Sequence, residues 1–425
     1  MNKKLIPYIK KYFKNRAFFA VFVLLLVALI VTRFSAMETK SLFAYDQVDN
    51  AWAVKNILID GNLPEHGMQA KGNTGFYIGP YYYYFLVPFY FITGMDPIAS
   101  PIAAGVTAVI TFFIVYFVTR SIFDEKVALV AVFINVFSNY ILTLDRVQWP
   151  VNFIVPISFL VLFSLYKILN GEFKYLLVLA GSIGFSLHIH FTSIFYGIYV
   201  LFSIPFVPWS RKIIKSILLS VPIFLIFTLP IFVSYLTSKQ AGTAANYLGS
   251  SYHGFHLRRV AQLYKDAIIE FNAILGFKNS HIASLVLLPI FLFLNIHKKY
   301  KRKNIVLVYL SVLWILIPWF AFSTYSGELT NYYFGITRTV AIISISYLVI
   351  KLINLKKIYI NLLLLVLGVT YVYLNMQSFI NQGPQSLAKT RESVKAKIGN
   401  GQKVEFVQGD PESYLYFYYK ELPKK

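Results

Sequence analysis

The stretch that decides the fold is FAYDQVDNAW, residues 43 to 52, which comes soon after the first apolar run of the chain. It contains two carboxylates, Asp46 and Asp49, in a chain where only 18 of 425 residues are Asp or Glu. Two acids three residues apart share one face of a helix, and such a pair suits a proton acceptor with an orienting neighbour. Capping of the helix predicted for the following AWAVKNILI is the alternative. Capping explains one acid more easily than two, so we expect a catalytic pair.

The composition is that of a membrane protein. Hydrophobic residues make up 57% of the chain and the mean hydropathy is +0.60. The net charge of +22 comes from Lys and Arg in short clusters between apolar runs, a pattern of membrane topology that predicts no nucleic-acid partner. The absence of cysteine excludes disulfides and thiolate metal sites.

Apolar runs that are long enough, or nearly so, to cross a bilayer recur along the chain. We count eleven: residues 17–32, 98–119, 127–144, 151–169, 175–191, 193–207, 213–236, 282–296, 305–322, 332–350 and 358–376. The sequence therefore predicts an all-α polytopic membrane protein with about 11 transmembrane helices.

A twelfth candidate, YIGPYYYYFLVPFYFI at residues 77–92, decides the topology. If this tyrosine-rich segment lies at the interface without crossing, all five basic loops fall on the same side as the basic N-terminus, which is the cytoplasmic side. We therefore expect a multi-pass protein of the cytoplasmic (inner) membrane, with its N-terminus inside and its C-terminus outside. The first outer loop is then 33–97, and residues 237–281 form a long outer lid loop.

Two domains are predicted, a transmembrane domain at residues 1–376 and a small extracytoplasmic appendage at 377–425. In the appendage a helix-like stretch, 386–397, precedes a strand-like 403–407 and an aromatic segment, 413–419. This order predicts a very small α/β unit that packs on the membrane domain, because so short a segment is not stable alone.

The second outer turn, DRVQWPVN at residues 145–152, has two interpretations. Asp145 and Arg146 suit an interfacial ion pair and Trp149 an anchor in the aromatic belt. The same residues offer a carboxylate, a phosphate-binding guanidinium and a stacking platform. Of the two histidines in SLHIHFTS, His190 is either a buried hydrogen-bonding group or a substrate contact. The two-residue spacing from His188 keeps them off a common helix face, so a two-histidine metal site is not expected.

The remaining candidates are basic and aromatic residues of the outer pieces. Arginines are the best candidates to meet a phosphate, with anionic lipid headgroups as the alternative ligand. Tyrosines of the segment 77–92 are placed to line the entry of a lipid chain. The candidate substrate-binding residues are Asp145, Arg146, Trp149, His190, Tyr247, Arg258, Arg259, Arg338, Tyr81 and Tyr82. No nucleotide-binding motif occurs, so an outer transferase needs a donor that is carried by a lipid.

From residue 42 to about 192 the chain resembles the GT-C glycosyltransferases, in particular the bacterial branch similar to protein O-mannosyltransferases and the lipid A aminoarabinose transferase. The likeness rests on YDQVDNA, GNLPEHG, TGFYIGPYYYYFLVPFYFITG, DRVQWPVN and HIHFT, and more weakly on the later NYYFGITR. It implies a GT-C fold, a polyprenyl-phosphate sugar donor and transfer with inversion on the outer face. Asp46 matches the catalytic aspartate of the first loop, and Asp49 matches the second acid of that motif.

The resemblance leaves the acceptor open among a glycan, a lipid and a protein, with membrane lipids as surroundings. The chain has no WWDYG-like stretch and no Asp-x-Asp in the second turn, so we assign no metal ligands and no cofactor, and a divalent cation stays an open alternative. A secondary transporter or flippase for a lipid-linked or small polar substrate is the rival class. It would favour ionisable residues near the bilayer midplane, whereas the charges here crowd the ends of the apolar runs.

Overall fold

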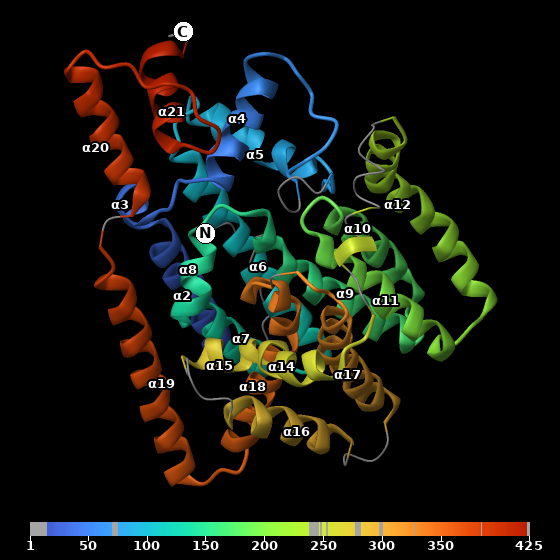
Figure 1. The fold of residues 1–425 in the computed structure, drawn as a ribbon. Helices are drawn as coiled ribbons and strands as arrows, with labels where there is room; N and C mark the ends of the chain where they lie inside the picture. Colours follow the sequence, from blue (N-terminus) through green and yellow to red (C-terminus); the bar gives the residue numbers. More distant parts are fainter. Residues whose placement is uncertain are drawn as a thin grey trace, which may run out of the picture.

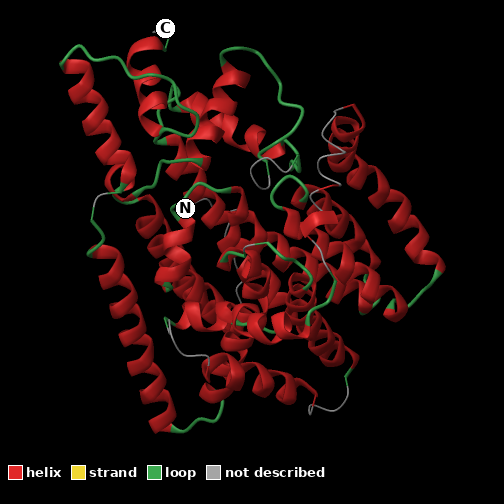
Figure 2. Ribbon diagram, in the orientation of Figure 1, coloured by secondary structure: helices red, strands yellow, loops and turns green. Residues whose placement is uncertain are grey.

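The computed structural model describes residues 15–69, 75–237, 246, 249–251, 254–276, 282–296, 301–327, 329–383 and 385–422. Its regular structure is helical (Figure 2), and one isolated β-bridge joins Gln69 to Tyr77. The α-helices labelled in Figure 1 are α2 (Arg16–Phe34), α3 (Met37–Lys40), α4 (Asp46–Leu58), α5 (Tyr81–Ile92), α6 (Ala99–Ile122), α7 (Glu125–Phe137), α8 (Asn139–Asp145), α9 (Ile154–Leu169), α10 (Leu176–Ser186), α11 (Ile194–Ser203), α12 (Arg211–Thr237), α14 (Leu257–Ala267), α15 (Ile269–Leu275), α16 (Ile282–Ile296), α17 (Arg302–Ser323), α18 (Arg338–Ile353), α19 (Ile358–Ile380), α20 (Ser386–Gly399) and α21 (Pro411–Tyr416).

Short tight turns of helix extend several of these elements. They are the 3₁₀ segments Pro150–Phe153, Phe173–Tyr175, Phe191–Ser193, Ile204–Phe206 and Asn331–Thr337, and the π-helical turn Phe417–Glu421. The first of them begins with Pro150, whose fixed φ suits the first position of a helix.

The apolar helices make this a polytopic membrane protein. Seven described helices are long and apolar enough to cross a bilayer, namely α2, α6, α9, α12, α17, α18 and α19, the third and sixth counted with their 3₁₀ turns. The pair α7 and α8 adds an eighth span if the 67° bend between them lies within one crossing. α10, α11 and α16 are shorter. All eleven predicted runs are thus helical, while seven or eight have the length and composition of a span.

The tyrosine-rich segment forms α5, a helix of 12 residues and so about 18 Å long. That length is well short of the roughly 30 Å hydrocarbon core of a bilayer. Leu86 and Tyr90 are buried, and the helix packs between α4 and α6. A non-crossing segment, as expected from the basic loops, fits this length.

The C-terminal tail returns to the beginning of the chain (Figure 1). The hydroxyl of Ser386 accepts from the N–H of Phe43 (2.7 Å) and donates to its carbonyl (3.1 Å). The N–H of Gln385 donates to the carbonyl of Thr39 (2.7 Å). The tail and the first predicted outer loop therefore lie at the same end of the molecule.

The predicted strand at 403–407 does not form. Residues 402–407 are extended, but the described part of the tail contains no second strand to pair with them. The hydroxyl of Ser413 meets part of their hydrogen-bonding capacity, because it accepts from Val407 N–H (3.0 Å) and donates to the carbonyl of Glu405 (2.9 Å). The described tail is therefore helical and not α/β, since a strand needs a partner as well as β-forming residues.

Candidate active site

The two acids of the opening stretch lie in the first turn of α4, where both are half-buried. The N-cap position of α4 is Tyr45, and no side chain makes a capping hydrogen bond there. The capping alternative for Asp46 and Asp49 is therefore not the one adopted. Negative charge in a first helical turn is favourable in itself, because the N–H groups of that turn point outward.

Trp149 holds Asp46 from the second turn of the predicted outer surface. Its indole N–H donates to Oδ2 of Asp46 at 2.5 Å, and its ring centroid lies 4.8 Å from that of Tyr332. Burial raises the pKa of Asp46, and the indole N–H opposes part of this rise. A half-buried carboxylate with a raised pKa is suited to accept a proton.

Asp49 lies beside Asp46 and shares its environment. Burial raises the pKa of Asp49, the neighbouring charge of Asp46 raises it further, and the backbone N–H of Gly409 partly offsets both effects. No ion pair among the described residues includes either acid. Within the part of the chain that the structure describes, the two neighbouring carboxylates therefore have no cationic partner.

Amide side chains connect α4, α5 and the turn before Trp149. Gln47 donates from Nε2 to the carbonyl of Gln148 (3.0 Å), and Gln148 donates from Nε2 to the hydroxyl of Tyr82 (2.7 Å). All three side chains are buried. Tyr82 therefore supports α4 through this chain of hydrogen bonds. The neighbouring Tyr83 lies close enough to the two acids to feel their charge. Burial raises the pKa of Tyr83, and the charges of Asp49 and Asp46 raise it further.

The two histidines have separate surroundings. The ring of His188 stacks on Tyr81 with centroids 4.1 Å apart, accepts the Tyr81 N–H at Nδ1, and so donates from Nε2 to the carbonyl of Phe227 (2.9 Å). Gly79 permits this approach, because a Cβ there would lie 1.9 Å from Nδ1 of His188.

His190 packs against the residues that contact Trp149. Its ring centroid lies 5.7 Å from Tyr332 and 5.2 Å from Tyr333, and Nδ1 lies 3.0 Å from the hydroxyl of Thr192. Burial lowers the pKa of His190 to about 3, so the ring is neutral at physiological pH. It offers a hydrogen bond or a stacking face to a ligand, and no positive charge.

Asp145 and Arg146 serve the packing of the second turn. Arg146 donates from Nη1 and Nη2 to four backbone carbonyls between residues 32 and 36, at 2.8 to 3.2 Å, and from Nε toward the carbonyl of Lys40 (3.5 Å). Asp145 accepts from Nε and Nη2 of Arg33, a side chain that is 1% exposed. The ion pair considered between Asp145 and Arg146 therefore does not form, because the cation that pairs with Asp145 is Arg33. All five N–H groups of Arg146 are already directed at backbone oxygens.

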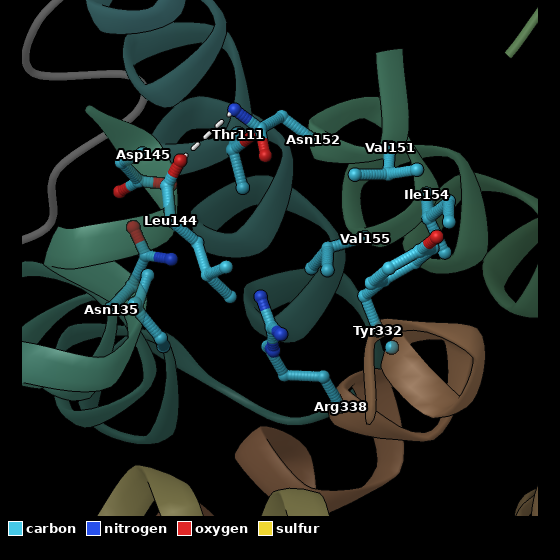
Figure 3. A pocket seen from close by; sticks show the side chains of 12 residues that line it. Thr111, Asn135, Leu144, Asp145, Val151, Asn152, Ile154, Val155, Tyr332 and Arg338 are labelled. Carbon is cyan, nitrogen blue, oxygen red and sulfur yellow. Dashed lines mark hydrogen bonds between the residues drawn. The ribbon is translucent and has the colours of Figure 1, made fainter. Parts of the chain in front are cut away.

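Arg338 is also held in a buried pair. Its Nε and Nη2 donate to Glu270 at 2.6 and 3.0 Å, and the hydroxyl of Tyr140 donates to Glu270 at 3.0 Å. The guanidinium points into a cavity of about 20 Å³ that Asp145 and Asn152 also line (Figure 3). Such a space holds about one water molecule, so a phosphate does not fit beside Arg338 in this conformation.

The two arginines of the predicted lid lie on α14. Arg258 is exposed, and Arg259 donates from Nη2 to the carbonyl of Gly327 (2.9 Å), which ties α14 to the turn after α17. Tyr247, the remaining predicted contact, lies outside the described residues. Among the described residues, no group of three or more His, Asp and Glu side chains is arranged to hold a metal ion.

The structure thus brings Asp46, Asp49, Trp149 and His190 into one neighbourhood through Tyr332, a residue that sequence reasoning did not select. Its signal was present in the stretch NYYFGITR, which was assigned to the family resemblance as a whole. Arg33 and Glu270 were also missed. Each is a charged residue in an apolar stretch, and such residues need a partner.

A largely apolar groove is lined by residues of the first loop, α5 and α12. It has a volume of about 1010 Å³ and lies between α5 and α12, and Tyr81, Tyr84 and Glu65 are among its lining residues. Prolines and aliphatic side chains of α12 form its far wall. Most of its lining residues are apolar or aromatic, so the groove suits an aliphatic chain.

Comparison with known proteins gives the fold. A family model described as dolichyl-phosphate-mannose-protein mannosyltransferase matches residues 78–236, a range that contains Trp149 and His190 but begins after the two acids. No curated protein matches the sequence.

Two solved structures superpose over most of this chain. ArnT from Cupriavidus metallidurans, solved alone and bound to undecaprenyl phosphate, aligns with a TM-score of 0.54 at 13% identity, over 76% of this chain and 59% of ArnT. The archaeal oligosaccharyltransferase AglB from Archaeoglobus fulgidus, in complex with an inhibitory peptide and a dolichol-phosphate, aligns with a TM-score of 0.60 at 13% identity, over 96% of this chain and 60% of AglB. The chain therefore spans about three fifths of the length of these proteins.

The protein is a polytopic membrane protein with the GT-C fold. The GT-C fold that the sequence motifs implied is confirmed by the two superpositions, and the family match over residues 78–236 agrees with it.

Proposed function

We propose that this protein is an inverting glycosyltransferase that moves a sugar from a polyprenyl-phosphate donor to an acceptor hydroxyl. The reaction takes place on the outer face of the cytoplasmic membrane, with the N-terminus of the chain inside and the C-terminus outside. One observation carries the proposal: Asp46, in a GT-C fold, is a half-buried carboxylate that Trp149 holds at one oxygen and that forms no ion pair with any described residue. ArnT with undecaprenyl phosphate and AglB with dolichol-phosphate support the class of donor.

The reaction needs one base and one place for the leaving group. The acceptor hydroxyl attacks the anomeric carbon of the sugar, its proton passes to Asp46, and the carbon–oxygen bond to the phosphate breaks. The electron pair of that bond leaves with the polyprenyl phosphate, which is already a stable anion and needs little acid assistance. A positioned base contributes on the order of a hundred- to ten-thousandfold to such a step. Asp49 is the orienting neighbour of Asp46, and its own pKa is raised by burial and by the charge of Asp46.

The donor binds in two places. Its polyprenyl chain occupies the groove between α5 and α12, where Tyr81 and Tyr84 line the wall. Its phosphate meets Arg258 and Arg259 of α14, because Arg146 and Arg338 are committed to backbone carbonyls and to Glu270. The sugar then lies between Trp149 and His190, whose flat faces suit a pyranose ring.

The test is release of polyprenyl phosphate from a panel of polyprenyl-phosphate sugars by the purified protein in liposomes. Asp46→Asn is expected to lose about a hundred- to ten-thousandfold in turnover. Asp60→Asn is the matched control, since this surface acid of the same loop pairs with the partly exposed side chain of Lys55 (2.7 Å). Its turnover is expected to stay within about twofold of wild type. Full activity of Asp46→Asn would exclude it as the base, and uptake of a donor without release of phosphate would favour the transporter class.

A further inference from the structure

We propose that the C-terminal tail is part of the candidate active site, and that the turn at residues 407–410, above all Gly409, positions the two acids. The inference rests on the proposed function for its catalytic consequence, and on the geometry alone for the positioning itself. Gly409 is thus a positioning residue that acts through backbone atoms on α4.

The first contact fixes the beginning of α4. The carbonyl of Gly409 accepts a hydrogen bond from the N–H of Tyr45 at 3.1 Å. Tyr45 has a φ of +40°, a conformation that costs energy for any residue except glycine, and its side chain is 79% exposed, so no side-chain packing compensates. The hydrogen bond from the tail therefore holds the strained residue that sets the direction of Asp46.

The second contact reaches Asp49. The N–H of the same glycine faces the Asp49 carboxylate, and a Cβ on Gly409 would lie 3.9 Å from Oδ1 of Asp49 and 3.7 Å from Cα of Tyr45. Gly409 has a φ of +72°, which only glycine adopts readily. The carbonyl of Gly409 therefore bonds Tyr45, just before α4, and its N–H faces Asp49, in the first turn of α4.

The tail is anchored firmly enough to act in this way. Trp52, one turn after Asp49 on α4, packs its ring against Phe406, Tyr414 and Phe417, with centroids 5.1 to 5.4 Å apart. The hydroxyl of Tyr414 donates to the carbonyl of Met95 at 3.0 Å. The turn at 407–410 thus lies between aromatic contacts on both sides, and its position relative to α4 is set by buried packing.

A second group of contacts holds α20. Arg391 pairs with Glu38 at 2.6 Å and with Asp96, and it donates to the hydroxyl of Tyr419 at 2.9 Å. These partners come from α3, from the end of the first loop and from the tail itself. The same tail therefore bridges the segments before and after the acids.

The experiment compares two glycines of the tail that have the same backbone conformation. Gly401 also has a φ of +72°, but a Cβ there would meet nothing within 4 Å. Gly409→Ala and Gly401→Ala therefore carry the same intrinsic backbone strain. Only at Gly409 does relief of this strain move peptide groups that bond Tyr45 and Asp49, because the added Cβ itself fits at ordinary contact distance. Hydrogen exchange of the peptide that covers residues 43–52, measured on the full-length protein, reports the positioning without any substrate.

Gly409→Ala is expected to exchange faster than wild type in residues 43–52, and Gly401→Ala is not. In the release assay Gly409→Ala is expected to lose about ten- to a hundredfold in kcat with little change in KM, as small displacements of catalytic groups do. Its acid limb is also expected to move to higher pH, because the N–H that lowers the pKa of Asp49 is displaced. The titratable groups that face Asp49 are Asp46 and Tyr83, and neither variant alters them.

Equal exchange of residues 43–52 in the two variants would overturn the proposal. If Gly409→Ala releases the whole tail, faster exchange will extend over residues 386–422. In that case Ser386→Ala tests whether the tail positions residues 43–52. That variant removes two hydrogen bonds to Phe43 at the far side of the tail, and it is expected to speed exchange in 43–52 while the tail stays folded. A wild-type protein that turns over no donor would refute the proposed function, whereas the exchange comparison would still test the positioning.

Discussion

Two sets of two carboxylates near the candidate active site have opposite surroundings. Asp46 and Asp49 are half-buried on α4 and have no cation among the described ion pairs. Asp145 and Glu270 each bind a guanidinium that is almost fully buried, Arg33 and Arg338, at 2.8 and 2.6 Å. The chain thus neutralises two of its acids and leaves two others uncompensated.

This difference in pairing separates acids that stabilise the fold from acids that are available for chemistry. A buried carboxylate without a partner is expensive, so folding favours pairing it wherever the chain permits. The pairs with Arg33 and Arg338 join α2 to α8 and α15 to α18, and they follow this rule. Asp46 and Asp49 break it at a helix N-terminus, where hydrogen-bond donors from Trp149 and Gly409 take the place of a cation. Such an exception is expected where the group has to accept a proton.

The largest effect is expected from breaking a compensated pair. Glu270→Gln leaves the Arg338 guanidinium buried without a carboxylate, and the protein is expected to lose about 3–5 kcal/mol of stability. Thermal unfolding in detergent micelles, followed by tryptophan fluorescence, measures the loss. The double variant Glu270→Leu with Arg338→Met is expected to recover much of it, because no charge is then left alone.

The control for this prediction is a pair at the surface. Lys55 and Asp60 are partly exposed, so Asp60→Asn is expected to change the stability by less than about 1 kcal/mol. An unchanged unfolding temperature for Glu270→Gln would mean that the Arg338 pair does not stabilise the fold.

An intermediate effect is expected from the hydrogen bond that replaces a cation at Asp46. Trp149→Phe keeps an aromatic ring against Tyr332 and removes the N–H on Asp46. A hydrogen bond to a charged group is worth about 1.5–3 kcal/mol, so kcat/KM is expected to fall about ten- to a hundredfold. The indole N–H lowers the pKa of Asp46, so the acid limb of the pH profile is expected to move to higher pH in the variant.

Trp209→Phe provides the comparison, because this tryptophan is 61% exposed and lies far along the chain from the acids. It is expected to leave both the rate and the pH profile unchanged. A loss of rate in Trp149→Phe without a shift of the acid limb would argue that the indole serves only as a packing surface.

Much of the fold was predictable because it depends on local properties of the chain. All eleven apolar runs are helical, and the three-residue spacing of Asp46 and Asp49 does place both acids in one helical turn. Part of the candidate site was predictable for the same reason. The pattern of basic loops assigned the turns that carry Trp149 and His190 to the same side of the membrane as the two acids.

The pairing of charges was not predictable in the same way. Arg33 lies 112 residues from Asp145, and Arg338 lies 68 residues from Glu270. Nothing in the local sequence chooses Arg33 over Arg146 as the partner of Asp145, because that choice depends on where α2 ends against α7 and α8. The missing strand at 403–407 has the same origin, since β-forming residues are local but a pairing partner is not.

The smallest effect is a difference in the sign of a pH dependence. Because folding raises the pKa of Asp46 and of Asp49, the folded state binds their protons more readily than the unfolded state. These groups therefore favour folding at low pH, and that contribution is lost as the pH rises through their folded pKa. The double variant Asp46→Asn with Asp49→Asn is expected to unfold at a higher temperature than wild type at neutral pH, and the difference is expected to shrink as the pH falls. Glu412 gives the opposite case, because hydrogen bonds from Lys397 and Ser393 lower the pKa of this glutamate. Glu412→Gln is expected to unfold at a lower temperature than wild type at neutral pH, and this difference in unfolding temperature is expected to disappear in acid. Unfolding temperatures of the three proteins across a pH series measure both trends, and two trends of the same sign would contradict the division between compensated and uncompensated acids.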